Sequence, residues 1–163
     1  MRYLMVDRVI QVRAGKSITA VKCATVSEDI YADHFYGNPV MPGALQIESL
    51  AQAGTILLEL SSGLTRKAVL VLVNNVKFRE LVRPGDQMEI EMTQNSSDGS
   101  VVQLDGTIRV SGKVVTVGRL TFSLQPIDDF YPPSMKVFTK IMYENFLRGA
   151  TLEGVDWPED WRG

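Results

Sequence analysis

The sequence predicts an α+β fold in which an antiparallel sheet wraps around one long helix. Two strand-like runs come first along the chain, followed by one strongly apolar helical run and then by four further strand-like runs. A helix that is apolar on nearly every side must be buried, and a sheet with one apolar face supplies the surface that buries it. Because 163 residues suffice for one sizeable core but hardly for two, we expect a single domain.

Six segments alternate apolar and polar residues and are enriched in β-branched side chains, a pattern that is typical of half-buried strands. Turn sequences separate them, such as Ala14-Gly15-Lys16 between the first two and Asp98-Gly99 among the last four. The predicted strands cover residues 3–12, 17–26, 68–78, 86–94, 101–110 and 114–124. The first two strands are expected to form a hairpin.

The helical run covers residues 43–60 and reads GALQIESLAQAGTILLEL, with Gly63 placed to end it. A loop, residues 27–42, precedes the helix and contains His34, which is the only histidine of the chain. Pro39 and Pro42 also lie in this loop, so its backbone is expected to be irregular but fixed.

The last 36 residues, 128–163, differ from the rest and are expected to form a helical extension that packs on the domain formed by residues 1–127. Ser134 is the predicted N-cap of its helix. Four apolar residues share one face of this helix, and that face should be buried against the domain or, alternatively, beside a ligand tunnel or a dimer seam, because an amphipathic helix gains its stability from packing. They are Met135, Phe138, Met142 and Phe146. An acidic tail with Trp157 and Trp161 follows.

Composition excludes several classes of function. A formal net charge of −2 gives no basic footprint for nucleic acid, and no apolar stretch reaches the roughly 20 residues needed to span a bilayer. With His34 as the only histidine and Cys23 as the only cysteine, the chain lacks the ligand clusters of soft-metal sites. We therefore expect no metal, no cofactor and a location in the reducing cytoplasm, where a lone cysteine forms no disulfide.

Two ionisable residues are candidates for acid–base chemistry. Glu48 lies in the apolar helix with Gln52 one turn later, and burying a carboxylate is costly unless it has partners. His34 belongs to the residue type that serves most often as a general base. Taken singly, each has an ordinary explanation: Glu48 as a satisfied or edge carboxylate, and His34 as a hydrogen-bonded loop residue.

Their surroundings carry a more specific signal. The loop reads His34-Phe35-Tyr36-Gly37-Asn38-Pro39-Val40-Met41-Pro42-Gly43 and leads into Glu48-Ser49-Leu50-Ala51-Gln52. Further matches are Leu4-Met5-Val6-Asp7-Arg8-Val9, Lys77-Phe78-Arg79 and Val82-Arg83-Pro84-Gly85-Asp86-Gln87. From about residue 3 to 125, the chain resembles the β-hydroxyacyl-acyl-carrier-protein dehydratase family, the FabZ type of the hot-dog superfamily. That family carries a loop histidine, followed at the same spacing by a helix glutamate in an ExxAQ motif.

The resemblance implies a hot-dog fold and a catalytic pair, His34 and Glu48, with Gly43 donating its backbone N–H to the thioester carbonyl. A neutral imidazole can remove the proton next to the carbonyl, and a buried carboxyl group can protonate the departing hydroxyl. Gln52 is implied as a substrate-binding residue beside Glu48. Because the sister group that also isomerises the double bond carries aspartate at position 48, we expect dehydration alone.

Tyr36 departs from the family, which usually has proline there. Two consequences are open: a less rigid loop, or a tyrosine side chain at the mouth of the substrate pocket. We therefore include Tyr36 among the candidate substrate-binding residues.

The resemblance also implies partners. Lys77, Arg79 and Arg83 are candidate contacts for an acidic acyl-carrier protein, although a solvated basic face explains each of them singly. A homodimer, or a higher oligomer built from dimers, is implied, with His34 of one subunit facing Glu48 of the other. Two alternatives remain at this point: an acyl thioesterase of the same fold, and a non-catalytic acyl-binding protein.

Overall fold

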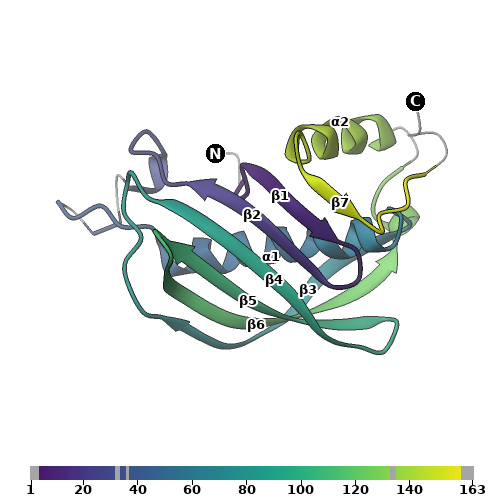
Figure 1. Ribbon diagram of the computed structural model, residues 1–163, viewed down its shortest axis with the longest axis horizontal. Coiled ribbons are helices and arrows are strands. Elements are labelled where there is room, and N and C mark those ends of the chain that lie inside the picture. The colour runs from purple at the N-terminus through teal and green to yellow at the C-terminus, as the bar shows by residue number, and fades with distance from the viewer. Residues whose placement is uncertain (1–3, 32–33, 36, 133–134, 159–163) are drawn as a thin grey trace.

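The structure, a computed structural model, describes residues 4–31, 34–35, 37–132 and 135–158. A seven-stranded sheet curves around the long helix α1, Gly43–Ser61, and its strand order is β3-β6-β5-β4-β2-β1-β7 (Figure 1). The strands are β1 Arg8–Arg13, β2 Ser17–Cys23, β3 Arg66–Phe78, β4 Gln87–Ser97, β5 Val101–Val110, β6 Lys113–Pro126 and β7 Thr151–Glu153. A second helix, α2, covers Lys136–Phe146. The predicted α+β architecture is confirmed.

Helix α1 lies in the concave side of the sheet because most of its surface is apolar. Twelve of its 19 residues are buried, and the core continues from them into the inward-facing residues of the strands. Gly54 permits close contact between the helix and the sheet, since a Cβ atom there would lie 2.8 Å from the ring of Phe122 and 3.0 Å from Leu104. Within the part of the chain that the structure describes, no helix has the length and apolar character to cross a membrane.

The two edges of the sheet differ. At one edge, β7 pairs in parallel with β1 through Gln11–Thr151 to Arg13–Glu153, whereas every other neighbouring pair is antiparallel. At the other edge, β3 exposes three consecutive apolar residues: Val71, Leu72 and Val73 are 55%, 51% and 38% exposed. Such an edge strand is a template for pairing with another strand.

The predicted helix agrees with α1 to within one residue, but the first strand is shorter than expected. β1 begins at Arg8, and the preceding residues Met5 and Val6 are buried outside any strand. Their apolar character reflects burial in the core. Alternation alone therefore overestimated the length of β1.

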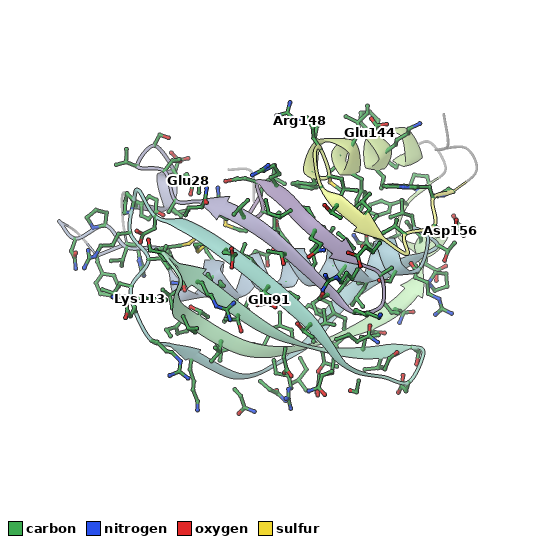
Figure 2. All side chains as sticks on the ribbon, in the orientation of Figure 1. Glu28, Glu91, Lys113, Glu144, Arg148 and Asp156 are labelled. Atoms are coloured by element: carbon green, nitrogen blue, oxygen red, sulfur yellow. The ribbon has the colours of Figure 1, made fainter. Side chains whose placement is uncertain are left out.

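The orientation predicted for the C-terminal helix is wrong. Phe138, Met142 and Met135 are 66%, 41% and 38% exposed, whereas Tyr143 and Leu147 are buried and Phe146 packs partly against the core. Helical periodicity groups residues on a face but does not say which of two neighbouring faces meets the domain. Figure 2 shows Glu144 and Arg148 on the side of this segment that points away from the sheet. Ser134 and Trp161, singled out from the sequence, lie outside the described residues.

A buried polar cluster joins α2 to the far end of α1. Glu59 is 2% exposed, accepts a hydrogen bond from the Tyr143 hydroxyl and pairs with the Lys67 ammonium at 2.6 Å. Burial, and then the negative charge of Glu59, raises the pKa of Tyr143 well above its ordinary value, so the hydroxyl stays protonated as a donor. The ring of Tyr131 lies 5.4 Å from the same ammonium. Glu59 is thus a buried carboxylate supplied with partners from α2 and β3.

We propose that residues 128–163 belong to the same folding unit as residues 1–127, and the contact between Tyr143 and Glu59 provides a test. Tyr143→Phe should lower the free energy of unfolding by about 2 kcal/mol, because it removes a donor from a buried charge. Phe138→Ala, in the exposed face of the same helix, should change it by less than about 0.5 kcal/mol. Urea unfolding measures both variants, and equal effects would contradict the assignment.

Candidate active site

One face of α1 is not covered by the sheet. Ala44 is exposed, and Ile47, Glu48, Gln52 and Thr55 are half-buried, whereas the remaining faces are packed into the core. Residues three or four apart lie on the same side of a helix, so these five form one open stripe. Glu48 is therefore half-buried at the rim of the core, less enclosed than the sequence suggested.

Glu48 is held by its neighbour one turn further along the helix. The side-chain amide of Gln52 donates a hydrogen bond of 2.8 Å to Glu48 Oε1. The carbonyl oxygen of the same amide accepts one of 2.8 Å from the backbone N–H of Met5. No cation pairs with Glu48 among the residues that the structure describes. The carboxyl group is thus oriented by Gln52 without a paired cation in this part of the chain, whereas Glu59 is paired with Lys67.

His34 is oriented by the chain just before α1. Its Nδ1 atom lies 3.0 Å from the carbonyl oxygen of Val40, and its ring meets Phe35 edge-on at 4.6 Å between centroids. Because a carbonyl oxygen only accepts, Nδ1 carries the hydrogen, and in the neutral ring Nε2 is then the free acceptor. This tautomer equips Nε2 to act as a general base.

Helix α1 begins directly after the histidine loop, residues 27–42, which contains His34. Pro42 is the N-cap and has no side-chain acceptor, and its carbonyl oxygen accepts the N–H groups of Leu45 at 3.0 Å and Gln46 at 3.3 Å. The N–H groups of Gly43 and Ala44, at the very start of the helix, therefore receive no acceptor from it. A Cβ atom at Gly43 would lie 2.8 Å from the ring of Phe78, so glycine is needed for the ring to lie against the helix start. Phe78 is half exposed. The sequence pattern gave this aromatic residue no role, since only the fold brings the end of β3 to Gly43.

The histidine loop is fixed at both ends. Near α1, the Met41 N–H donates to the Val82 carbonyl at 2.8 Å. The Arg83 guanidinium donates to the side-chain carbonyl of Asn38 at 2.6 Å. Near its other end the loop contains the turn η1, Asp29–Tyr31, in which Tyr31 is buried. The loop is therefore tied to the β3–β4 connection.

The candidate partner-binding residues fall into two groups. Lys77 and Arg79 are exposed near the end of β3, with two-residue spacing that puts them on one side of the extended chain. Arg83 is also exposed, but its guanidinium already bonds Asn38 of the histidine loop. Arg83 thus has a role in holding the loop that the sequence did not indicate.

The structure brings His34, Gly43, Glu48 and Gln52 to the first half of α1 and the loop before it. In the described residues, the polar partners of His34 and Glu48 are Val40 and Gln52 rather than each other. Tyr36 lies outside the described residues. In that described part, no cluster of three or more His, Cys, Asp or Glu side chains is arranged to hold a metal ion.

Comparison with solved structures identifies the fold. A dehydratase heterocomplex from Xenorhabdus doucetiae has a chain that matches with a TM-score of 0.60 and 17% identity, covering 85% of this chain and 90% of that one. A thioesterase from Haemophilus influenzae matches with a TM-score of 0.56 and 18% identity over 76% and 81% of the two chains. At these identities the likeness shows the fold, which is the predicted hot-dog fold of α1 wrapped by a sheet.

The sequence itself defines the family more narrowly. Residues 1–119 match the model of the FabA-like domain. The 3-hydroxyacyl-[acyl-carrier-protein] dehydratase FabZ of Rickettsia conorii is 38% identical over 121 residues, which are 73% of this chain and 83% of that protein. The chain therefore belongs to the FabA-like family, and FabZ dehydratases are among its relatives, as the histidine and glutamate motifs predicted.

The buried Tyr31, at the end of η1, gives a test of this local structure. Its hydroxyl has no hydrogen-bond partner among the described residues, and burial, with the charges of Glu28 and Asp86, raises its pKa to about 12. The pKa of Tyr31 is thus higher in the folded state than in the unfolded state. The contribution of the protonated hydroxyl to the free energy of unfolding is therefore fully present below about pH 10 and is lost as the pH rises toward 12.

Tyr31→Phe should therefore unfold no more easily than wild type at neutral pH and should lose less stability between about pH 10 and 12. Urea unfolding at a series of pH values measures the difference. An equally steep alkaline loss in both proteins would show that Tyr31 is not buried as described.

Proposed function

We propose that the protein removes water from β-hydroxyacyl thioesters of an acyl-carrier protein, yielding trans-2-enoyl thioesters for fatty-acid or related lipid synthesis. The observation that carries this proposal is Glu48 on the open face of an otherwise buried helix, directly after a loop in which Val40 binds His34 Nδ1 and leaves Nε2 as the acceptor nitrogen of the neutral ring. The curated relatives support the same reaction, because they are named 3-hydroxyacyl-[acyl-carrier-protein] dehydratases. We place the reaction in the cytoplasm.

The proposed mechanism assigns one proton transfer to each member of the pair. His34 Nε2 takes the proton from C2, and the electrons of that C–H bond form the new double bond between C2 and C3. The C3–O bond breaks as Glu48, in its protonated form, gives its proton to the departing hydroxyl, so that water leaves. The imidazole accepts one proton and the carboxyl group donates one, so the reaction is balanced without an oxidant or a reductant.

The start of α1 suits the charge that develops on the thioester oxygen. Removal of the C2 proton shifts negative charge to the carbonyl oxygen, and N–H groups at a helix N-terminus stabilise negative charge. We assign this role to the N–H of Gly43. The ring of Phe78 lies against Gly43 and supplies an apolar surface beside the helix start.

A homodimer is part of the proposal, because each chain has an unpaired strand edge and an uncovered helix face. β3 is an open edge with the apolar residues Val71, Leu72 and Val73, and α1 keeps its Glu48 face uncovered. A two-fold axis beside β3 would join two such edges and bring His34 of one subunit toward Glu48 of the other. We further assign Lys77 and Arg79 to recognition of the acyl-carrier protein, with Arg83 as a loop anchor near it.

The second candidate is a thioesterase, since solved thioesterases share the fold. Hydrolysis requires an activated water or carboxylate at the thioester carbonyl, whereas His34 and Glu48 in the dehydratase spacing address C2 and C3. A non-catalytic acyl-binding protein has no evident use for the two ionisable side chains. Release of free thiol, as opposed to the absorbance of the enoyl thioester, separates hydrolysis from dehydration.

The catalytic pair is tested by His34→Ala and Glu48→Gln. Each should lower kcat by about 100-fold to 10,000-fold, because each removes one of two proton transfers, while urea unfolding stays close to wild type. Glu89→Gln, at an exposed position of β4, is the matched carboxylate control and should keep full activity. Turnover is followed by enoyl absorbance. A kcat within a few-fold of wild type in either variant of the pair would refute the mechanism.

The shared site is tested by mixing inactive His34→Ala and Glu48→Gln chains. Random pairing makes half of the dimers mixed, and each mixed dimer has one intact site, so about one quarter of wild-type activity should return. Subunit exchange is verified by mass spectrometry of labelled chains. Verified exchange without recovered activity would place both residues of each site in one chain.

A further inference from the structure

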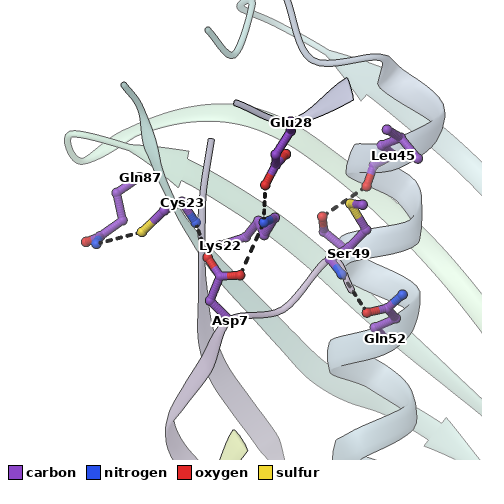
Figure 3. A network of polar contacts seen from close by, with 9 residues as sticks. Asp7, Lys22, Cys23, Glu28, Leu45, Ser49, Gln52 and Gln87 are labelled. Carbon is purple, nitrogen blue, oxygen red and sulfur yellow. Dashed lines mark hydrogen bonds and ion pairs between the residues drawn. The ribbon is translucent and has the colours of Figure 1, made fainter. Parts of the chain in front are cut away.

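Lys22 is an almost fully buried lysine that the proposed mechanism does not use. It belongs to β2, is 5% exposed, and places its ammonium 3.2 Å from Asp7 Oδ1 and 2.5 Å from Glu28 Oε1. Figure 3 shows the ammonium between the two carboxylates, beside α1. Lysine is rarely buried unless it is paired.

Each carboxylate belongs to a segment that leads to one half of the candidate active site. Glu28 lies immediately before the turn η1, from which the loop continues to His34. Asp7 lies two residues after Met5, whose N–H holds the Gln52 side chain that in turn bonds Glu48. Asp7 is itself fixed, since its other oxygen accepts the Cys23 N–H at 2.7 Å. Lys22 thus joins the segment that leads to His34 to the segment that holds Gln52 and, through it, Glu48.

Electrostatics keep this bridge charged. Burial works against the charged form of Lys22, but hydrogen bonds and charges from Glu28 and Asp7 outweigh it, so its pKa is raised above the ordinary value. A buried ion pair of this kind adds little stability compared with apolar groups of the same size. A gain in stability therefore explains the three charges of Lys22, Asp7 and Glu28 poorly. Holding the two segments that carry the carboxylates in one fixed geometry explains them better.

We propose that Lys22 is a positioning residue for the dehydration, joining Asp7 to Glu28 so that the histidine loop and the Glu48–Gln52 pair keep a fixed relation. The proposal rests on the proposed function. Lys22 acts through the segments that carry Asp7 and Glu28, because among the described residues it touches neither His34 nor Glu48. A displacement of about 1 Å between reacting groups can cost about 100-fold in rate, so such a bridge matters for catalysis.

The test separates positioning from charge balance. Lys22→Met removes the bridge and leaves two carboxylates without their cation. The triple variant Asp7→Asn, Lys22→Met, Glu28→Gln removes the bridge and the charges together, so its stability should return toward wild type. Lys22→Arg keeps a cation that can reach both carboxylates. Lys113→Met is the matched control, because Lys113 is exposed at the start of β6, and β5 and β4 separate that strand from β2.

Two readouts are taken on untagged protein. The first is kcat and KM with a β-hydroxyacyl thioester: kcat should fall by about 10-fold to 100-fold in Lys22→Met and in the triple variant, with KM within about twofold. Lys22→Arg should recover part of kcat, and Lys113→Met should match wild type. A triple variant that recovers both stability and kcat would overturn the proposal, since charge balance would then be the whole role of Lys22.

The second readout is the imidazole NMR signal of His34, which is unambiguous because the chain has one histidine. In Lys22→Met and in the triple variant the signal should broaden or split, as the loop samples several positions, while Lys113→Met keeps the single wild-type signal. An unchanged signal in folded Lys22→Met overturns the proposal. This readout requires no turnover, so absence of dehydratase activity in wild type would refute the proposed function and leave the positioning role to be decided by the NMR signal.

Discussion

The burial of α1 is the constraint on which the rest of the structure depends. Twelve of its 19 residues are buried, and the sheet reaches around them with Gly54 allowing contact with Phe122 and Leu104. The seven-stranded sheet is open, with β3 and β7 at its edges, and one stripe of the helix stays uncovered. That stripe carries Glu48, so the packing of the core also determines where an ionisable group can meet a substrate.

Two carboxylates on the same helix are treated in opposite ways. Glu59 is enclosed and supplied with the Lys67 cation and the Tyr143 hydroxyl, so its charge is compensated inside the protein. Glu48 is half-buried, oriented by Gln52 and left without a cation among the described residues. The first arrangement joins α2 and β3 to the far end of α1, whereas the second leaves a carboxyl group on the open face of the helix.

The sequence predicted what depends on local pattern, and missed what depends on distant contacts. The bounds of α1 follow from an uninterrupted helical run, and the loop motif identified the family through His34 and Glu48. The buried face of α2 could not be predicted, because the periodicity offers two apolar sectors and only docking on Glu59 selects Tyr143. The bond of Arg83 to Asn38 and the contact of Phe78 with Gly43 each join segments more than 30 residues apart, so no local signal could have revealed them.

The central claim is that the open face of α1, with the histidine loop, removes water from a β-hydroxyacyl chain while the thioester stays intact. The most direct measurement is the intact mass of a β-hydroxyacyl-loaded acyl-carrier protein before and after incubation with the protein. We predict a decrease by the mass of one water molecule, with the acyl chain still attached. Conversion to the carrier protein with a free thiol, or an unchanged mass, would contradict the account.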